Sequence, residues 1–98
     1  MKVVYSPRAV ADLRSISAYL RPRSLQGAKR VRAAILATIT QLVTFPRLGT
    51  PQTTPNVYKL LTRRYNYLIY YTAVPEAGDA IYIITIRHPS QQREFEDA

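Results

Sequence analysis

The sequence predicts an α+β fold, a two-layer sandwich in which a helical hairpin packs on a small, mainly antiparallel sheet. Two long segments with helical periodicity come first, and three segments rich in Tyr, Ile and Val follow them. A short apolar segment at the start of the chain completes the order β-α-α-β-β-β. Because 98 residues suffice for one small hydrophobic core, we expect a single domain over residues 1–98.

The first helix is expected directly after a short strand at Lys2 to Tyr5. Ser6 is suited to the N-cap and Pro7 to the first helical position. Spacings of four, three and four residues give one apolar face as far as about Leu20, formed by Ala9, Leu13, Ile16 and Leu20. Asp12 falls on the opposite side of this helix and is expected to be solvated.

A second helix is expected from about Leu25 to Thr44, with Ser24 as its N-cap. Pro22 separates it from the first helix, and Pro46 follows its end. Its apolar stripe consists of Ala28, Val31, Ile35, Ile39 and Leu42. Two amphipathic helices joined by a short connection predict an antiparallel helical hairpin.

Three strands are expected in the second half of the chain, after a Pro- and Thr-rich loop at residues 47–56. They cover Val57 to about Thr62, about Tyr65 to Val74, and Ala80 to His88, with a hairpin turn at residues 75–79. A polar tail at residues 91–98 follows.

Side-chain alternation along these strands makes both faces of the sheet apolar. In the last strand Ile81 and Ile83 are expected on one side, and Tyr82, Ile84 and Ile86 on the other. Two helices cover only one face, so we expect the second face to be partly exposed and rich in Tyr, as is typical of a partner site. The alternative is that loop 47–56 and the tail cover it.

Several classes of chemistry find no support in the sequence. The chain has no Cys and one His, so it offers no disulfide framework and no metal-ligand cluster. Its Gly residues are scattered, which excludes a phosphate-binding loop, and neither its Ser nor its carboxylates form a recognisable catalytic set. We therefore expect no cofactor and no metal.

The positive charge is the main functional signal. The net charge is +8, and most of the basic residues are Arg, which favours bidentate contacts with carboxylates and phosphates. A nucleic acid or an acidic protein fits such a surface, and a merely solvated basic surface is the alternative. The candidate binding residues near the strands are Lys59, Arg63, Arg64, Tyr67, Tyr71, Arg87, His88 and Arg93.

An RNA-cleaving site could be assembled from four of these residues. His88 would act as general acid or base near neutral pH, and Arg87, Arg63 and Arg64 would stabilise charge on the phosphate. The alternative is that Arg63 and Arg64 form a solvated turn and that His88 is a structural residue.

Ordered motifs along almost the whole chain resemble the RelE/ParE toxin superfamily, on the ParE side. They are Ser6-Pro7-Arg8-Ala9 leading to Asp12-Leu13, then residues 42–49, 57–60 and 64–71, and a last strand at 81–88. Each piece is degenerate alone, and the ordered set at this spacing is fairly specific.

The resemblance implies the toxin of a type II toxin–antitoxin system. ParE-like toxins poison DNA gyrase, whereas RelE-like toxins are ribosome-dependent mRNA endoribonucleases. The implied partner is a ParD-like antitoxin whose N-terminal part binds DNA and whose acidic C-terminal part wraps the toxin, so the toxin reaches DNA only through the complex. Together with the absence of Cys and of an apolar leader or membrane segment, this predicts a cytoplasmic protein without membrane contact.

One departure from the pattern bears on the choice between these activities. Pro89 to Gln92 follow His88 where many ParE-like chains have basic residues, and Arg93 comes later. No Tyr follows the last strand and no acidic residue lies in the expected core, which weakens the RNase reading. The sequence therefore favours an inhibitor of gyrase over an enzyme, with the RelE-type endoribonuclease as the alternative.

Overall fold

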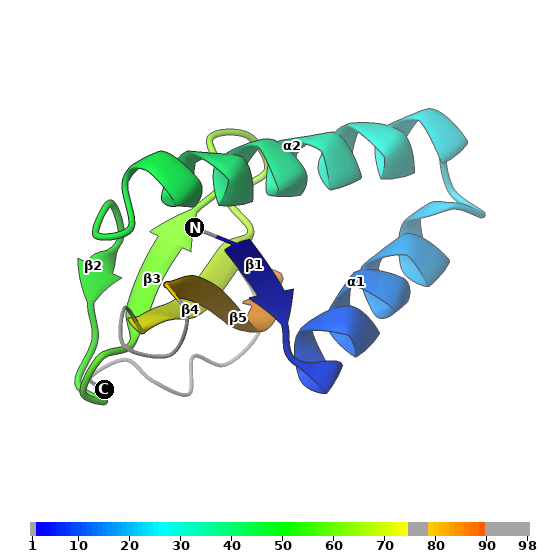
Figure 1. Cartoon of the computed structure of the whole chain (residues 1–98). Helices are drawn as coiled ribbons and strands as arrows, with labels where there is room; N and C mark the ends of the chain where they lie inside the picture. Colours follow the sequence, from blue (N-terminus) through cyan, green and yellow to red (C-terminus); the bar gives the residue numbers. More distant parts are fainter. Residues whose placement is uncertain (1, 75–78, 90–98) are drawn as a thin grey trace.

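The computed structural model describes residues 2–74 and 79–89, and Figure 1 shows its helices and its sheet as two layers. In chain order the elements are β1 (Lys2–Tyr5), α1 (Pro7–Leu20), α2 (Leu25–Thr44), β2 (Thr50–Pro51), β3 (Tyr58–Leu61), β4 (Leu68–Val74) and β5 (Ala80–Arg87). The predicted α+β architecture, with a helical hairpin on a mainly antiparallel sheet, is confirmed.

The sheet has five strands in the order β1-β5-β4-β3-β2. Strand β1 runs parallel to β5, and the other neighbours are antiparallel. The sequence did not predict β2, because it lies in a segment whose composition is that of a loop. Its Pro51 has no backbone N–H, and such a residue is tolerated only at the edge of a sheet, where β2 lies.

Both predicted helix starts are confirmed in detail. The Oγ atom of Ser6 accepts a hydrogen bond from the Ala9 N–H at 2.9 Å, and Ser24 Oγ accepts one from Gly27 at 2.9 Å. Each cap thereby satisfies one of the N–H groups that a helix start leaves without a partner. The two helices consequently begin where the sequence predicts.

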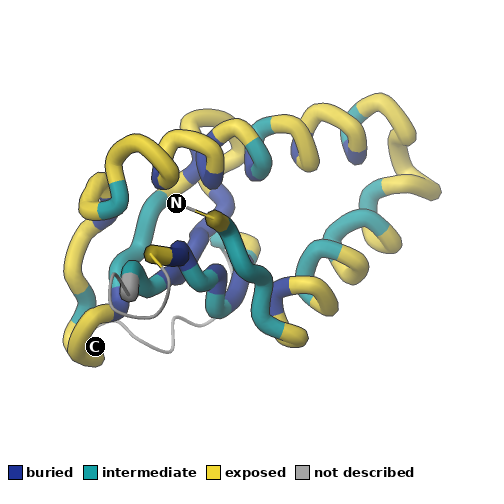
Figure 2. Tube along the Cα trace, in the orientation of Figure 1, coloured by how far each residue is buried: buried dark blue, intermediate teal, exposed yellow. Residues whose placement is uncertain are grey.

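The core lies between the helices and one face of the sheet, and Figure 2 shows the buried positions gathered there. All five residues of the apolar stripe predicted for α2 are buried, whereas α1 buries only Ala9 completely. Leu13, Ile16 and Leu20 of α1 are half-buried and pack against this core. The N-terminal part of α1 is therefore packed against the core, and its C-terminal part is more exposed.

A β-bulge in β5 alters the predicted alternation of side chains. Tyr70 pairs with Thr85 and Tyr71 pairs with Ile83, so Ile84 has no partner in the ladder. Because a bulge shifts the side-chain pattern by one residue, Ile86 joins Ile83 in the helix-side core. The prediction that these two residues point to opposite faces was wrong.

The beginning of α1 is bonded to this bulge. The Ser6 N–H donates to the Ile83 carbonyl at 2.9 Å, and Ser6 Oγ–H donates to the Ile84 carbonyl at 2.6 Å. Asp12 Oδ2 accepts from Thr85 Oγ1 at 2.5 Å and from the Ile86 N–H at 3.0 Å. The expectation that Asp12 is solvated was therefore wrong, because its carboxylate accepts hydrogen bonds from the bulged strand.

The β3–β4 hairpin has a longer loop than the sequence predicts. Strand β4 begins at Leu68 and not near Tyr65, because Tyr65 and Asn66 have φ values of 70° and 53°. A positive φ places a residue in the left-handed region, which a strand does not use. Arg63 and Arg64 consequently lie in a hairpin loop, residues 63–66, and are exposed.

Candidate functional site

Five of the predicted site residues lie at one end of the sheet: Arg63, Arg64, Tyr67, Arg87 and His88. The loop containing Arg63 and Arg64 ends beside Tyr67, and Arg87 pairs with the next residue, Leu68. His88 follows Arg87 and its ring meets that of Tyr67 edge-on, with a centroid separation of 5.5 Å and an interplanar angle of 88°. The fold thus brings two separate basic segments to the same end of the molecule.

Arg87 and His88 nevertheless do not share one face of the sheet. Arg87 pairs with Leu68, which belongs to the cluster on the face away from the helices, whereas His88 contacts Tyr67, which belongs to the helix-side core. Lys59 lies further along β3, paired with Tyr70. Arg93 lies outside the described residues. Of the predicted RNase constellation, Arg87 therefore lies on the opposite face of the sheet from His88.

Tyr67 and Tyr71 are core residues and not surface residues. Tyr67 is 6% exposed and Tyr71 is 0% exposed, and both pack beneath the helices. Tyr71 Oη accepts a hydrogen bond from the Gly49 N–H at 2.9 Å, and its ring stacks on that of Tyr58. Both were predicted as binding candidates, and in the structure they lie on the face that the helices cover.

The second face of the sheet is also closed at its centre. Leu68 is 1% exposed and Tyr70 is 0% exposed, and Val57 packs against them with Ile84 at the margin. The expectation of a partly open, Tyr-rich face was therefore wrong at these positions. Apolar side chains on both faces give this sheet two hydrophobic clusters.

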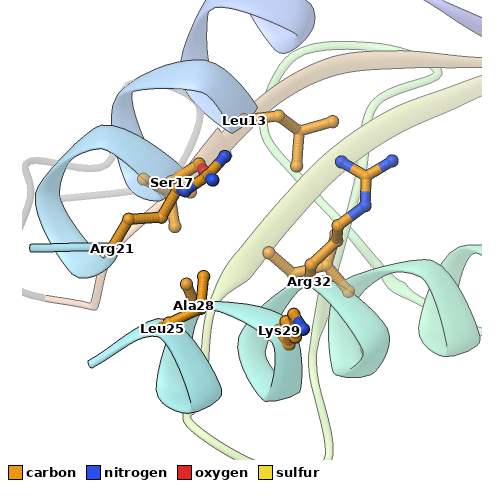
Figure 3. Close-up of a pocket in the computed structure, with 9 residues that line it drawn as sticks. Leu13, Ser17, Arg21, Leu25, Ala28, Lys29 and Arg32 are labelled. Carbon is orange, nitrogen blue, oxygen red and sulfur yellow. The ribbon is translucent and has the colours of Figure 1, made fainter.

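The first such surface is a groove between α1 and α2, which we call the interhelix groove. It has a volume of about 290 Å³, and Figure 3 shows side chains from both helices facing one another across it. Its apolar residues are Leu13, Ile16, Leu25, Ala28 and Ile35. Arg21, Lys29 and Arg32 supply positive charge along the same groove.

Arg32 of the interhelix groove acts electrostatically on Tyr5, the last residue of β1. Burial raises the pKa of Tyr5 above its ordinary value of 10.0, and the positive charge of Arg32 opposes that rise. The apolar residues of the interhelix groove, with cations around them, fit an acidic, amphipathic helix or strand of a partner. The sequence predicts helices that cover the sheet and not a groove between them, although Lys29 and Arg32 directly follow the apolar residues Ala28 and Val31.

A second surface lies on the other side of α2, and we call it the hairpin groove. It has a volume of about 580 Å³ between the helix and the β3–β4 loop. Arg63 and Arg64 line it from the loop, Leu61 from β3, and Ala34, Ala37, Thr38 and Gln41 from α2. Two of the predicted site residues, Arg63 and Arg64, therefore line a groove together with α2. The sequence did not predict that they lie beside this helix.

Within residues 2–74 and 79–89, no group of three metal-ligating side chains comes together. None of the helices described is both long enough and apolar enough to cross a bilayer.

Solved structures of toxin–antitoxin systems have this fold. The chain is similar to a chromosomal ParDE toxin–antitoxin system from P. aeruginosa, with 22% identity and a TM-score of 0.75 over 90% of this chain and 95% of that one. It is also similar to the intact RelBE toxin–antitoxin complex of E. coli (14% identity, TM-score 0.65, 92% and 98% covered). A mutant of E. coli toxin RelE in complex with an antitoxin RelBc peptide gives 16% identity and a TM-score of 0.69 over 92% and 84%.

At these identities the likeness establishes the RelE/ParE fold. The family follows from the sequence model of the ParE toxin of the type II toxin–antitoxin system parDE, which matches residues 3–93. The chain therefore belongs to the ParE toxin family, as its motifs predict. No curated protein sequence matches this chain.

Proposed function

We propose that this ParE-family protein inhibits DNA gyrase by binding it and that an acidic antitoxin neutralises it. Membership of the ParE family, over residues 3–93, is the observation that carries the proposal. The net charge of +8 and the two grooves with basic residues support binding to acidic protein surfaces. The action would take place in the cytoplasm, with DNA reached through the gyrase or antitoxin complex.

A supercoiling assay with purified protein and purified DNA gyrase tests this proposal. We expect inhibition of supercoiling, together with accumulation of cleaved DNA, at toxin concentrations comparable to that of the enzyme. Unchanged supercoiling with a large molar excess of folded toxin would contradict the proposal.

The RelE-type endoribonuclease is the second candidate, and the gathering of Arg87, His88, Arg63 and Arg64 at one end of the sheet favours it. The location of Arg87 and His88 on opposite faces of the sheet speaks against a common phosphate site. Primer extension on cellular mRNA after induction separates the two activities, because new cleavage sites would appear only with the endoribonuclease.

The interhelix groove is the surface that we propose for the antitoxin. An amphipathic acidic segment would bury its apolar side against Leu13, Ala28 and Ile35 and place carboxylates near the surrounding cations. The double variant Arg21→Glu with Lys29→Glu should weaken cognate antitoxin binding at least about tenfold, because it replaces attraction by repulsion. Isothermal titration calorimetry measures this change.

A matched control for that variant is Arg30→Glu with Arg47→Glu. Both residues are exposed and neither lines the groove, so the control changes the net charge by the same amount elsewhere. Equal losses of antitoxin affinity in the two double variants would show that overall charge, and not the groove, governs binding.

A further inference from the structure

The two grooves lie on different sides of α2 and have no lining residue in common. Leu25, Ala28 and Lys29 belong to the interhelix groove, whereas Ala34, Ala37 and Gln41 belong to the hairpin groove. A segment bound in one groove therefore leaves the residues of the other uncovered. The fold offers separate surfaces for two partners.

The arginines of the hairpin groove are carried by a loop that is closed by hydrogen bonds. The Thr62 N–H donates to the Tyr67 carbonyl at 2.9 Å, and Thr62 Oγ1 accepts from the Tyr67 N–H at 3.0 Å. The same hydroxyl donates to the Arg64 carbonyl at 2.5 Å. Because this buried threonine fixes the loop ends and the Arg64 backbone, less conformational entropy is lost when a partner binds.

Two further features of the β3–β4 hairpin are unfavourable for the isolated molecule. Tyr65 has a φ of 70°, a left-handed conformation that costs energy for a residue with a bulky side chain. Leu61 and Tyr65 are 44% and 43% exposed beside the two arginines. Backbone strain and exposed apolar groups next to Arg are features of binding surfaces, where Arg and Tyr are enriched.

The walls of the hairpin groove indicate the chemistry of its occupant. Arg63 and Arg64 line it together with Leu61 and two alanines, and none of the described lining residues is acidic. Arginine side chains bind carboxylates in bidentate geometry, and an apolar residue of the occupant can pack on Leu61 and Ala37. A phosphate backbone would use the arginines and leave this apolar wall in water, so the groove suits an acidic protein segment better.

We infer that the hairpin groove binds an acidic segment of the target enzyme, anchored by an apolar residue on Leu61, while the interhelix groove receives the antitoxin. This inference rests on the proposed function and assigns to it the surface that contacts gyrase. It separates the surface that acts on the target from the surface through which the toxin is neutralised.

Binding of purified DNA gyrase to the immobilised toxin tests the inference, with the double variant Arg63→Glu and Arg64→Glu compared with wild type. We expect at least about a tenfold loss of gyrase affinity, because the carboxylates would face an acidic segment. The control Arg30→Glu with Arg47→Glu has the same charge change outside both grooves and should stay within about twofold of wild type. Thermal unfolding confirms that both variants are folded.

A second variant reaches the same groove from its other wall. Ala37→Glu introduces a carboxylate on the exposed side of α2 without altering the hairpin loop, so it should also weaken gyrase binding. Wild-type affinity in both Ala37→Glu and the arginine variant would overturn the inference and leave the proposed function intact. Absence of gyrase binding by the wild-type protein would overturn the proposed function and the inference with it. If the Arg63→Glu and Arg64→Glu variant lost binding to duplex DNA but bound DNA-free gyrase as wild type does, the groove would be assigned to nucleic acid. That result would also overturn the inference.

Discussion

Gly49 is a residue at which the structure leaves no room for a side chain. An added Cβ would lie 2.8 Å from the Lys59 carbonyl oxygen and 2.9 Å from the Tyr71 hydroxyl. The Gly49 N–H donates to that same hydroxyl, so the loop after α2 is seated on the core by a close backbone approach. The sequence shows a Gly among Pro and Thr residues, which predicts a loop but not this contact.

Gly49→Ala should therefore lower the free energy of unfolding by about 1 to 3 kcal/mol, because one of the fixed neighbours must move. Urea unfolding measures this difference. Thr50→Ala, at the exposed next position, is the control and should change stability by less than about 0.5 kcal/mol. Equal stabilities of the two variants would show that the loop adjusts without cost.

Tyr71 shows why single residues of the site were hard to assign from sequence. A Tyr in a predicted strand can face the core, the solvent or a partner, and its alternation with Tyr70 is compatible with each. The choice is made by which face α2 covers, which depends on packing between segments distant in sequence. The arginines of the hairpin loop, by contrast, lie at an exposed corner between two strands, as their position in the sequence predicts.

At the scale of elements, α1 and β5 are joined through one carboxylate. Asp12 accepts hydrogen bonds from the Thr85 hydroxyl and the Ile86 N–H, and both donors lie on buried residues of the bulged strand. Ser6 donates hydrogen bonds to the Ile83 and Ile84 carbonyls, which come just before these donors in the same strand. The motif Ser6-Pro7 followed by Asp12 thus has a structural role, since it satisfies strand atoms around the bulge.

Asp12→Ala should reduce the free energy of unfolding by about 2 to 3 kcal/mol, because two donors lose a charged acceptor. Asp12→Asn should be milder, since its amide oxygen can still accept from one donor. Urea denaturation of the three proteins gives the order wild type, Asn, Ala. An Ala variant as stable as wild type would mean that water replaces the carboxylate without loss.

The elements themselves were predictable to different extents. Helix starts and stripes follow from local rules, so Ser6, Ser24 and the α2 stripe were correct. The bulge at Ile84, the two-residue strand β2 and the start of β4 depend on pairing between strands and on left-handed residues. Hydrophobic periodicity contains no signal for the bulge, for β2 or for the start of β4. These features affect how the elements are placed relative to one another, and both grooves depend on that placement.

For the whole molecule, three tyrosines of the helix-side core link stability to alkaline pH. Burial raises the pKa of Tyr5, Tyr67 and Tyr71 above the ordinary value of 10.0, and for Tyr71 the Gly49 hydrogen bond partly opposes the rise. The unfolded chain releases these protons first as pH increases. The stabilisation is therefore complete below the ordinary pKa and is lost as pH rises through the folded-state values.

Urea unfolding between about pH 8 and about pH 11 should show a falling free energy of unfolding on the alkaline side. Tyr67→Phe should make the decline shallower, because one buried ionisable hydroxyl is removed. A free energy of unfolding that does not change over this interval would contradict the linkage.

The parallel pairing of β1 with β5 gives the molecule a particular order of assembly. Ser6, directly after β1, donates a hydrogen bond to the Ile84 carbonyl across a sequence separation of 78 residues. During translation the first strand emerges early, and its partner emerges only after both helices and the β3–β4 hairpin have been made. Contacts so distant in sequence form late in folding. A growing chain can consequently complete neither its sheet nor the bonds around the bulge until its last strand has left the ribosome.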